Sequence, residues 1–389
     1  MRKVISTEKL PIKLWLDEAE EGAIAQAKNL ANLPFAFGHI SLMPDCHEGY
    51  GMPIGGVMAT VNVVIPNAVG VDIGCGMCAV KTSLQSVTSE QIRQLMSGIR
   101  KLIPLGFNHH KHKQDIQLMP STEQIVPNGM VEREFENART QIGTLGGGNH
   151  FIEIQKGSDG YIWLMVHSGS RNIGLKVAEH YNHLAGKLNE QWHSGIEKSK
   201  NLAFLPLEIP EAIQYMNEMQ YCIDFAFANR KLMMTNIESV FADHFGSRFS
   251  ELEFINIAHN YARKERHFNH DVIVHRKGAT SARKGETGII PGSQGTKSYI
   301  VKGKGNAESF ESCSHGAGRL MGRKQAQRSL DLKAEIAMLD KKGIIHSLRH
   351  QKDLDEAPGA YKDINTVMDN QNDLVDIVVE LSPLAVIKG

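Results

Sequence analysis

Short apolar runs that end at a histidine or border a glycine-rich loop are the feature that most constrains this chain. They fall in residues 57–78, 143–154, 161–174 and 252–261. Apolar runs of this length between turn residues are typical of strands, and glycine lets a ligand approach the backbone closely. The pattern predicts strands that present reactive side chains in loops around a ligand.

Helical patterns fill much of the remaining chain. Thr88 to Gln91 has a capping-box pattern and predicts a helix that runs to about Ile103. Residues 175–248 predict mostly helix with an interruption near Pro206. We expect this long segment to be a helical excursion packed on the outside of the sheet-bearing body.

Charge and cysteine usage limit the function classes. The 389 residues carry 43 Lys plus Arg and 43 Asp plus Glu, so the net charge of zero argues against a protein that coats nucleic acid with its whole surface. No run of 18 apolar residues and no apolar signal core occur, so we expect a cytoplasmic protein without a membrane span. Five cysteines in such a chain are expected to be reduced thiols, available as metal ligands.

Five potential metal ligands border the apolar runs. They are one carboxylate, one thiol and three imidazoles: Asp72, Cys75, His150, His167 and His259. This mixed donor set suits a divalent transition ion, and a thiolate can bridge two ions. Two neighbouring ions can hold a triphosphate. Cys75 and Cys78 also form a Cys-x-x-Cys pair, which leaves a redox or zinc site as an alternative, although Cys78 fits packing better.

The octapeptide Ser312 to Arg319 places His315 among small residues, a few positions before helix-forming residues 323–339. An anion near that helix start would meet free N–H groups and a positive dipole end. We interpret His315 as a nucleophile that takes up a nucleotide phosphate. The alternative is a capping or core histidine beside a tight turn.

Four further stretches have less specific patterns. Asp45-Cys46-His47 at a Pro-Asp turn predicts either a surface turn or part of a site, and at most two of these side chains should face one ligand. Residues 263–284 carry a local basic excess, which predicts a phosphate-binding face or a solvated loop. Residues 289–299 have the small-residue character of a phosphate or base pocket but lack Walker spacing. The histidines in 109–112 predict a solvated loop.

Eight motifs in one order resemble the RtcB-type tRNA-splicing RNA ligases, and the similarity runs nearly end to end. The motifs are Met-Pro-Asp-x-His at 43–47, Gly-Val-Asp-Ile-Gly-Cys-Gly at 70–76, Gly-Asn-His-Phe at 148–151, His-Ser-Gly-Ser-Arg at 167–171, His-Asn-Tyr at 259–261, Pro-Gly-Ser at 291–293, Cys-Ser-His-Gly-Ala-Gly-Arg at 313–319 and the terminal Lys-Gly. One departure is Cys46, where the family more usually has valine.

The resemblance implies an α+β fold, a central β-sheet body around a deep metal and nucleotide cleft with flanking helices, in a single domain over 1–389. It implies a ligase that uses GTP and two Mn²⁺ ions to join RNA ends bearing a 2′,3′-cyclic phosphate or 3′-phosphate to 5′-hydroxyl ends, in tRNA splicing or RNA repair. We expect a monomer, with an archease-type activator as an optional partner.

The resemblance also assigns roles to individual residues. His315 would be guanylylated, Asp45 would orient it, and Arg319 and Arg171 would hold phosphate. Cys75 would bridge both ions, with His167 and His259 on one ion and Asp72 and His150 on the other. The implied nucleotide pocket is formed by Asn149, His150, Phe151, Ile152, Glu153, His259, Asn260, Pro291, Gly292, Ser293, Gln294, Ser298, His315, Gly316, Ala317, Gly318, Tyr361 and Lys388.

Two rival functions compete with ligation. The first is a metal-dependent cyclic phosphodiesterase or end-capping guanylyltransferase that never seals RNA. The second is a metal-stabilised RNA or nucleotide sensor without turnover, against which the intact His315 and the full ligand set argue.

Overall fold

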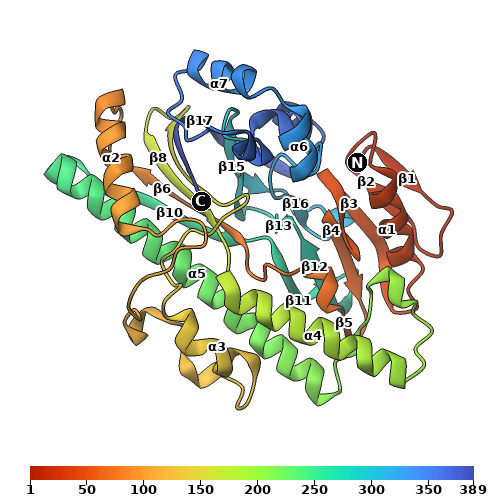
Figure 1. The fold of residues 1–389 in the computed structure, drawn as a ribbon. Coiled ribbons are helices and arrows are strands. Elements are labelled where there is room, and N and C mark those ends of the chain that lie inside the picture. Colours follow the sequence, from red (N-terminus) through yellow and green to blue (C-terminus); the bar gives the residue numbers. More distant parts are fainter.

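The computed structural model describes residues 1–389 and contains two large β-sheets, with long helices along one side (Figure 1). The first sheet has the strand order β1-β2-β3-β4-β12-β11. Its strands are β1 (Lys3–Ile5), β2 (Ile12–Leu14), β3 (Ala36–Tyr50), β4 (Met52–Thr60), β11 (Asn260–His267) and β12 (His270–Lys277).

The second sheet has the order β10-β6-β8-β7-β17-β15-β14. Its strands are β6 (Gly76–Thr82), β7 (Phe151–Gly157), β8 (Ile162–Ser168), β10 (Glu251–Ala258), β14 (Thr287–Ile290), β15 (Ser298–Gly303) and β17 (Val375–Lys388). Two small two-stranded sheets pair β13 (Ala279–Ser281) with β16 (Ser312–Ser314) and β5 (Val63–Val64) with β9 (Leu205–Pro206). The expected α+β architecture is confirmed.

Eight α-helices flank the sheets. They are α1 (Glu21–Ala31), α2 (Ser89–Leu102), α3 (Met130–Ala138), α4 (Arg171–Gln191), α5 (Pro210–Phe245), α6 (Arg323–Ser329), α7 (Leu332–Lys341) and α8 (Ile364–Asp369). The capping box that the sequence predicts at the start of α2 is present. The Thr88 hydroxyl oxygen accepts from the Gln91 backbone N–H group, and the Gln91 side-chain oxygen accepts from the Thr88 backbone N–H group. No helix has both the length and the apolar character needed to cross a membrane.

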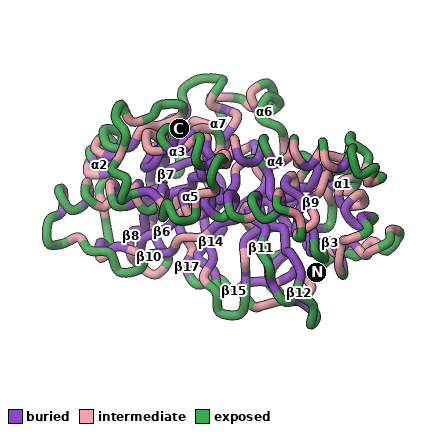
Figure 2. The backbone as a smooth tube through the Cα atoms, turned by 90° about the horizontal axis from the view of Figure 1, so that it is seen from below, coloured by how far each residue is buried: buried purple, intermediate pink, exposed green.

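The expectation that the helices of 175–248 pack on the outside is wrong for α5. This helix supplies buried side chains to two of the hydrophobic clusters, among them Phe225 and Met233. Figure 2, which is coloured by residue burial, shows buried residues along parts of α5 and the neighbouring strands. Its sequence carries apolar residues on several faces, which is typical of a helix that is buried on more than one side.

Two local expectations need correction. Pro44 and Asp45 do not form a turn, because β3 continues through them to Tyr50, with register shifts against β4. The basic segment 263–284 is neither one loop nor one phosphate-binding face. It forms most of the β11–β12 hairpin, in which Arg276 is buried and paired with Glu265.

Candidate metal and nucleotide site

The five predicted metal ligands lie together at one edge of the second sheet. Both β8 and β10 are antiparallel to β6, so their last residues pair with Gly76, the first residue of β6. The first residue of β7, Phe151, pairs with His167 in the same way. Strand ends and the loops that follow them therefore bring distant parts of the sequence to one place.

The donor atoms form two groups that share Cys75. In the first group, the donor atoms of Cys75, His167 and His259 lie within 4.8 Å of one another, and in the second those of Asp72, Cys75 and His150 do so. The Cys75 Sγ atom is 3.3 Å from the His167 Nε2 atom and 3.5 Å from the His150 Nε2 atom. The shared thiol makes this arrangement suited to two neighbouring ions.

The protonation states of these residues fit metal binding. Burial, followed by the nearby imidazoles, holds the pKa of His167 and of His259 well below the usual value, so both rings are neutral and able to bind a cation. Burial and the adjacent Asp72 raise the pKa of the Cys75 thiol. A cation would stabilise the thiolate, because metal binding replaces the thiol proton.

Second hydrogen bonds fix the orientation of two imidazoles. The Nδ1 atom of His150 lies 2.9 Å from the Leu145 carbonyl oxygen, and that of His167 lies 3.1 Å from the Asn149 carbonyl oxygen. These bonds leave each Nε2 atom facing Cys75, as in metal-binding histidines generally. Cys78 packs instead in a separate apolar cluster, so the alternative of a paired Cys75–Cys78 site is not supported.

His315 follows β16 directly and is held by a fully buried carboxylate. Its Nδ1 atom lies 2.6 Å from Asp45 Oδ2, which also accepts from the backbone N–H groups of His315 and Gly316. Burial alone would raise the pKa of Asp45, but electrostatic attraction to the His315 imidazole and the hydrogen bond between them outweigh burial and lower it. The Nδ1–H···Asp45 bond leaves Nε2 as the free nitrogen.

The surroundings of His315 agree with a reactive role rather than a capping role. No helix starts at this residue, since α6 begins only at Arg323. The ring of His315 lies 4.8 Å from the ring of His259, centroid to centroid. Of the three neighbours at 45–47, Asp45 and His47 face the site while Cys46 packs in an apolar cluster, which confirms that at most two would face one ligand.

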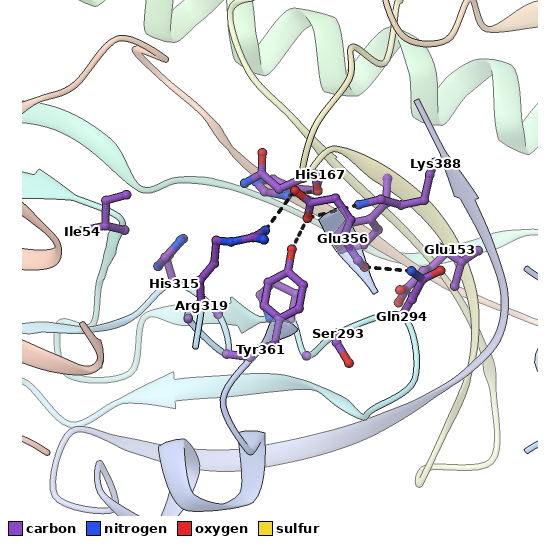
Figure 3. Close-up of a pocket in the computed structure, with 18 of the residues that line it drawn as sticks. Ile54, Glu153, His167, Ser293, Gln294, His315, Arg319, Glu356, Tyr361 and Lys388 are labelled. Atoms are coloured by element: carbon purple, nitrogen blue, oxygen red, sulfur yellow. Dashed lines mark hydrogen bonds and ion pairs between the residues drawn. The ribbon is translucent and has the colours of Figure 1, made fainter. Parts of the chain in front are cut away.

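A cavity next to the metal ligands brings together most of the predicted nucleotide-binding residues (Figure 3). Thirteen of the eighteen line it: Asn149, Phe151, Glu153, Pro291, Gly292, Ser293, Gln294, His315, Gly316, Ala317, Gly318, Tyr361 and Lys388. In Figure 3, His315 and Glu153 lie on opposite sides of Tyr361 and Glu356. The cavity therefore has the imidazole of His315 at one end and the buried carboxyl group of Glu153 at the other.

The other five predicted residues do not line the cavity. His150 and His259 belong to the metal-ligand groups, and the side chain of Ile152 packs in an apolar cluster. Asn260 donates to the Asp72 carbonyl oxygen at 3.0 Å and so supports the metal-ligand loop. Ser298 is buried behind the cavity and accepts from the Gly292 backbone N–H group.

Comparison with known proteins identifies the chain. The family model described as tRNA-splicing ligase RtcB matches residues 26–130 and 114–389. The chain belongs to the RtcB family. It is 37% identical to the RNA-splicing ligase RtcB of Escherichia coli K12 over 409 residues, which covers 100% of this chain and 99% of that protein. It is 30% identical to the tRNA-splicing ligase RtcB of Thermococcus kodakarensis, over 95% of this chain and 92% of that protein.

RtcB proteins are RNA ligases, and this member is an enzyme of that class. The Escherichia coli strain ATCC 25922 has a similar protein, RNA-splicing ligase RtcB1, at 37% identity over the full length of this chain. The match extends over all the strands and loops that form the metal-ligand groups and the cavity.

Sequence reasoning missed one central residue of this RtcB site, Glu356. It is the last residue of the 3-10 helix Gln351–Glu356, and no motif or spacing in that segment marks it. Its carboxylate lies 3.1 Å from Arg319, 2.8 Å from Arg323 and 3.8 Å from Lys388. It also accepts a hydrogen bond from the Tyr361 hydroxyl group.

The charges around Glu356 explain its protonation state. Burial alone would raise its pKa, but attraction to Lys388 and Arg323 lowers it, so the carboxylate stays ionised. Three cations thus surround one anion, which leaves a positive excess facing the cavity. Such an excess favours binding of a phosphate group.

Proposed function

We propose that the protein is a GTP- and Mn²⁺-dependent ligase that joins RNA 2′,3′-cyclic phosphate or 3′-phosphate ends to 5′-hydroxyl ends through a guanylylated His315. One observation carries the proposal. The Nδ1 atom of His315 is held by Asp45, and its ring lies between the group of metal ligands and a cavity of nucleotide-binding character.

The donor set supports two divalent transition ions. Cys75, His167 and His259 would hold one, and Asp72, Cys75 and His150 the other. When bound, such ions supply positive charge that stabilises phosphate oxygens during an in-line displacement. The buried Nδ1 atom of His259 has no protein hydrogen-bond partner, which fits a ring in a site built for an ion.

The protein side chains prepare the first chemical step. Asp45 keeps the proton on Nδ1 of His315, so the lone pair is on Nε2. Nε2 would attack the α-phosphorus of GTP, a P–N bond would form, and the bond to the β-phosphate oxygen would break to release pyrophosphate. The ionised Asp45 stabilises the positive charge that develops on the ring.

The far end of the cavity fits guanine. Burial raises the pKa of Glu153 to about 8 when no base is present. Guanine carries two adjacent N–H donors on its Watson–Crick edge, and these would stabilise the ionised carboxylate. Adenine lacks this donor pair, so Glu153 would favour GTP over ATP. Phe151 and Tyr361 supply aromatic surface beside the carboxyl group.

The remaining steps join the RNA. Water opens a cyclic phosphate to a 3′-phosphate, whose oxygen attacks the phosphorus bound to His315 and breaks the P–N bond. The 5′-hydroxyl oxygen then attacks the activated 3′-phosphate, forms the phosphodiester and releases GMP. Arg319 and Arg323 border the cavity and would hold the RNA phosphate.

The test is incubation of the purified protein with Mn²⁺ and GTP labelled at the α-phosphate. We expect one acid-labile GMP per chain, and none in His315→Ala. Equal labelling of that variant would overturn the nucleophile assignment.

Analysis of the RNA products separates the rival functions. With 3′-phosphate and 5′-hydroxyl strands, a ligase gives one joined product, whereas a phosphodiesterase or end-capping enzyme leaves two pieces. A sensor without turnover would release no pyrophosphate. Addition of an archease-type protein to the same assay measures whether an activator increases turnover.

A further inference from the structure

The loop that follows α2 holds Phe107 in an unusual position. Phe107 is 98% exposed, whereas the next most exposed large apolar side chain, that of Tyr50, is 61% exposed. Because the phenyl ring is in solvent, it contributes almost no hydrophobic free energy to the stability of the fold. A single exposed apolar residue is ordinary on a protein surface, so the place of Phe107 in the fold and its neighbours determine how it should be interpreted.

The loop is tied down on both sides of Phe107. The Gly106 N–H group donates to the Gly146 carbonyl oxygen at 3.2 Å. The His110 backbone N–H group donates to the Thr140 carbonyl oxygen at 2.9 Å. The guanidinium group of Arg171 donates to the Gly106 carbonyl oxygen at 3.3 Å. The backbone is therefore fixed, and the ring is held out into solvent.

The same contacts place Phe107 at the rim of the ligase site. Gly146 belongs to the glycine loop that carries His150, one of the metal ligands. A Cβ atom added at Gly106 would lie 3.4 Å from the carbonyl carbon of Gly389, which follows the cavity residue Lys388. Gly106 therefore lies between the glycine loop and the C-terminal residues of the cavity wall, and Phe107 is the next residue in the sequence.

The residues beside Phe107 complement a polynucleotide. Lys111 is exposed, forms no ion pair in the structure and is a cation next to the loop. His109 is also exposed, but partial burial of its ring and the nearby Arg171 lower its pKa, so it offers a neutral hydrogen-bonding ring rather than a second cation. Aromatic rings interleaved with cationic side chains bind single-stranded RNA, because the ring stacks on a base and the cations meet the phosphates. A partner protein would instead be expected to bury several neighbouring apolar side chains.

We propose that Phe107 is a stacking platform for a base of the single-stranded RNA near the end that is joined, with Lys111 facing its phosphates and the His109 ring beside it. The inference rests on the proposed ligase function and adds a specific RNA-binding residue to it. Phe107 positions the RNA and takes no part in the chemistry at His315.

The experiment compares Phe107→Ala, Phe107→Leu and Phe107→Trp in ligation of RNA with 3′-phosphate and 5′-hydroxyl ends. Loss of one stacked base should raise the KM for RNA roughly 5- to 150-fold in the alanine and leucine variants. The tryptophan variant should keep a KM close to that of the wild type, because the aromatic face is restored. Ile213→Ala, an exposed apolar site on α5, is the control.

A second measurement identifies the base. RNA with 2-aminopurine at successive positions should lose fluorescence at one position on binding the wild-type protein, and not on binding Phe107→Ala. An abasic nucleotide at that position should abolish the difference in KM between the two proteins. An unchanged KM in Phe107→Ala, or full function in Phe107→Leu, would overturn the proposal, as would a defect seen only with a protein partner.

These readouts are separate from the proposed chemistry. Guanylylation of His315 needs no RNA, so every Phe107 variant should label with GTP at the wild-type rate. The fluorescence assay needs no GTP. Failure of labelling in the wild type would therefore count against the proposed function, and failure of quenching would count against the role of Phe107.

Discussion

The Nδ1 atom of His315 and the Oδ2 atom of Asp45 lie 2.6 Å apart although 270 positions separate the two residues in the chain. Asp45 is fully buried, and the same oxygen accepts two backbone N–H groups from the loop at 315–316. One carboxylate therefore sets both the tautomer of the imidazole and the path of the backbone that carries it.

Asp45→Asn should slow guanylylation by about 10²- to 10⁴-fold, because an amide can donate to Nδ1 and so favour the wrong tautomer. Single-turnover labelling with GTP measures the rate, and near-ultraviolet circular dichroism checks the fold. The control is Asp17→Asn, at an exposed position. Wild-type labelling in Asp45→Asn would contradict the role of this carboxylate.

Cys75→Ala should lose more bound Mn²⁺ than His259→Ala, because Cys75 belongs to both groups of donors and His259 to only one. Elemental analysis after equilibration with Mn²⁺ gives the metal content per chain. Cys46→Val is the matched control, since Cys46 is also buried but packs in an apolar cluster away from the donors. Equal metal loss in the two ligand variants would refute a shared thiolate.

Glu153→Gln should become more stable relative to the wild type as the pH rises from 5 to 8. Burial holds the pKa of Glu153 at about 8 in the folded protein, against an ordinary value of 4.5. Between these values the folded protein keeps a proton that the unfolded chain releases, so wild-type stability falls with rising pH by on the order of 1 kcal/mol per pH unit.

The glutamine side chain cannot titrate, so Glu153→Gln should lack this part of the pH dependence. Thermal unfolding at pH 5, 6.5 and 8, without nucleotide, measures the difference in Tm. Glu18→Gln, at an exposed position, should follow the wild type throughout. Parallel curves for Glu153→Gln and the wild type would show that Glu153 titrates normally.

Arg230→Ala should lower the free energy of unfolding by about 3–5 kcal/mol and weaken metal binding. The fully buried Arg230 on α5 donates to the carbonyl oxygens of Gly74 and Ser168, each at 2.9 Å, and these residues adjoin metal ligands. Denaturant unfolding and Mn²⁺ titration measure the two effects. Lys231→Ala changes the exposed neighbour and should be neutral.

The members of the two candidate metal-binding groups could be picked out from the sequence because each lies at a strand end or in a glycine loop, where local sequence is informative. Their convergence depends on the antiparallel order β10-β6-β8-β7, which no local pattern specifies. Local sequence also could not show that the turn predicted at Pro44 is absent. Strand β3 (Ala36–Tyr50) continues through Pro44 because its register against β4 shifts there.

Two other residues show why the sequence reading was incomplete. Glu356 lies at the end of a short 3-10 helix, and only the tertiary fold brings Arg319, Arg323 and Lys388 around it. The excess of basic residues at 263–284 suggested a phosphate-binding face, but Glu265 neutralises Arg276 inside the protein. Charge counts along a chain do not show which charges are already paired.

The position of β17 has a consequence for synthesis of the protein on the ribosome. This last strand lies between β7 and β15, and its residues Val386 and Lys388 form part of the cavity wall. Before it emerges, the second sheet exists only as two separate portions. A nascent chain that already contains His315 therefore still lacks a closed nucleotide pocket, and the ability to react with GTP should arise only after β17 has left the ribosome and paired with β7 and β15.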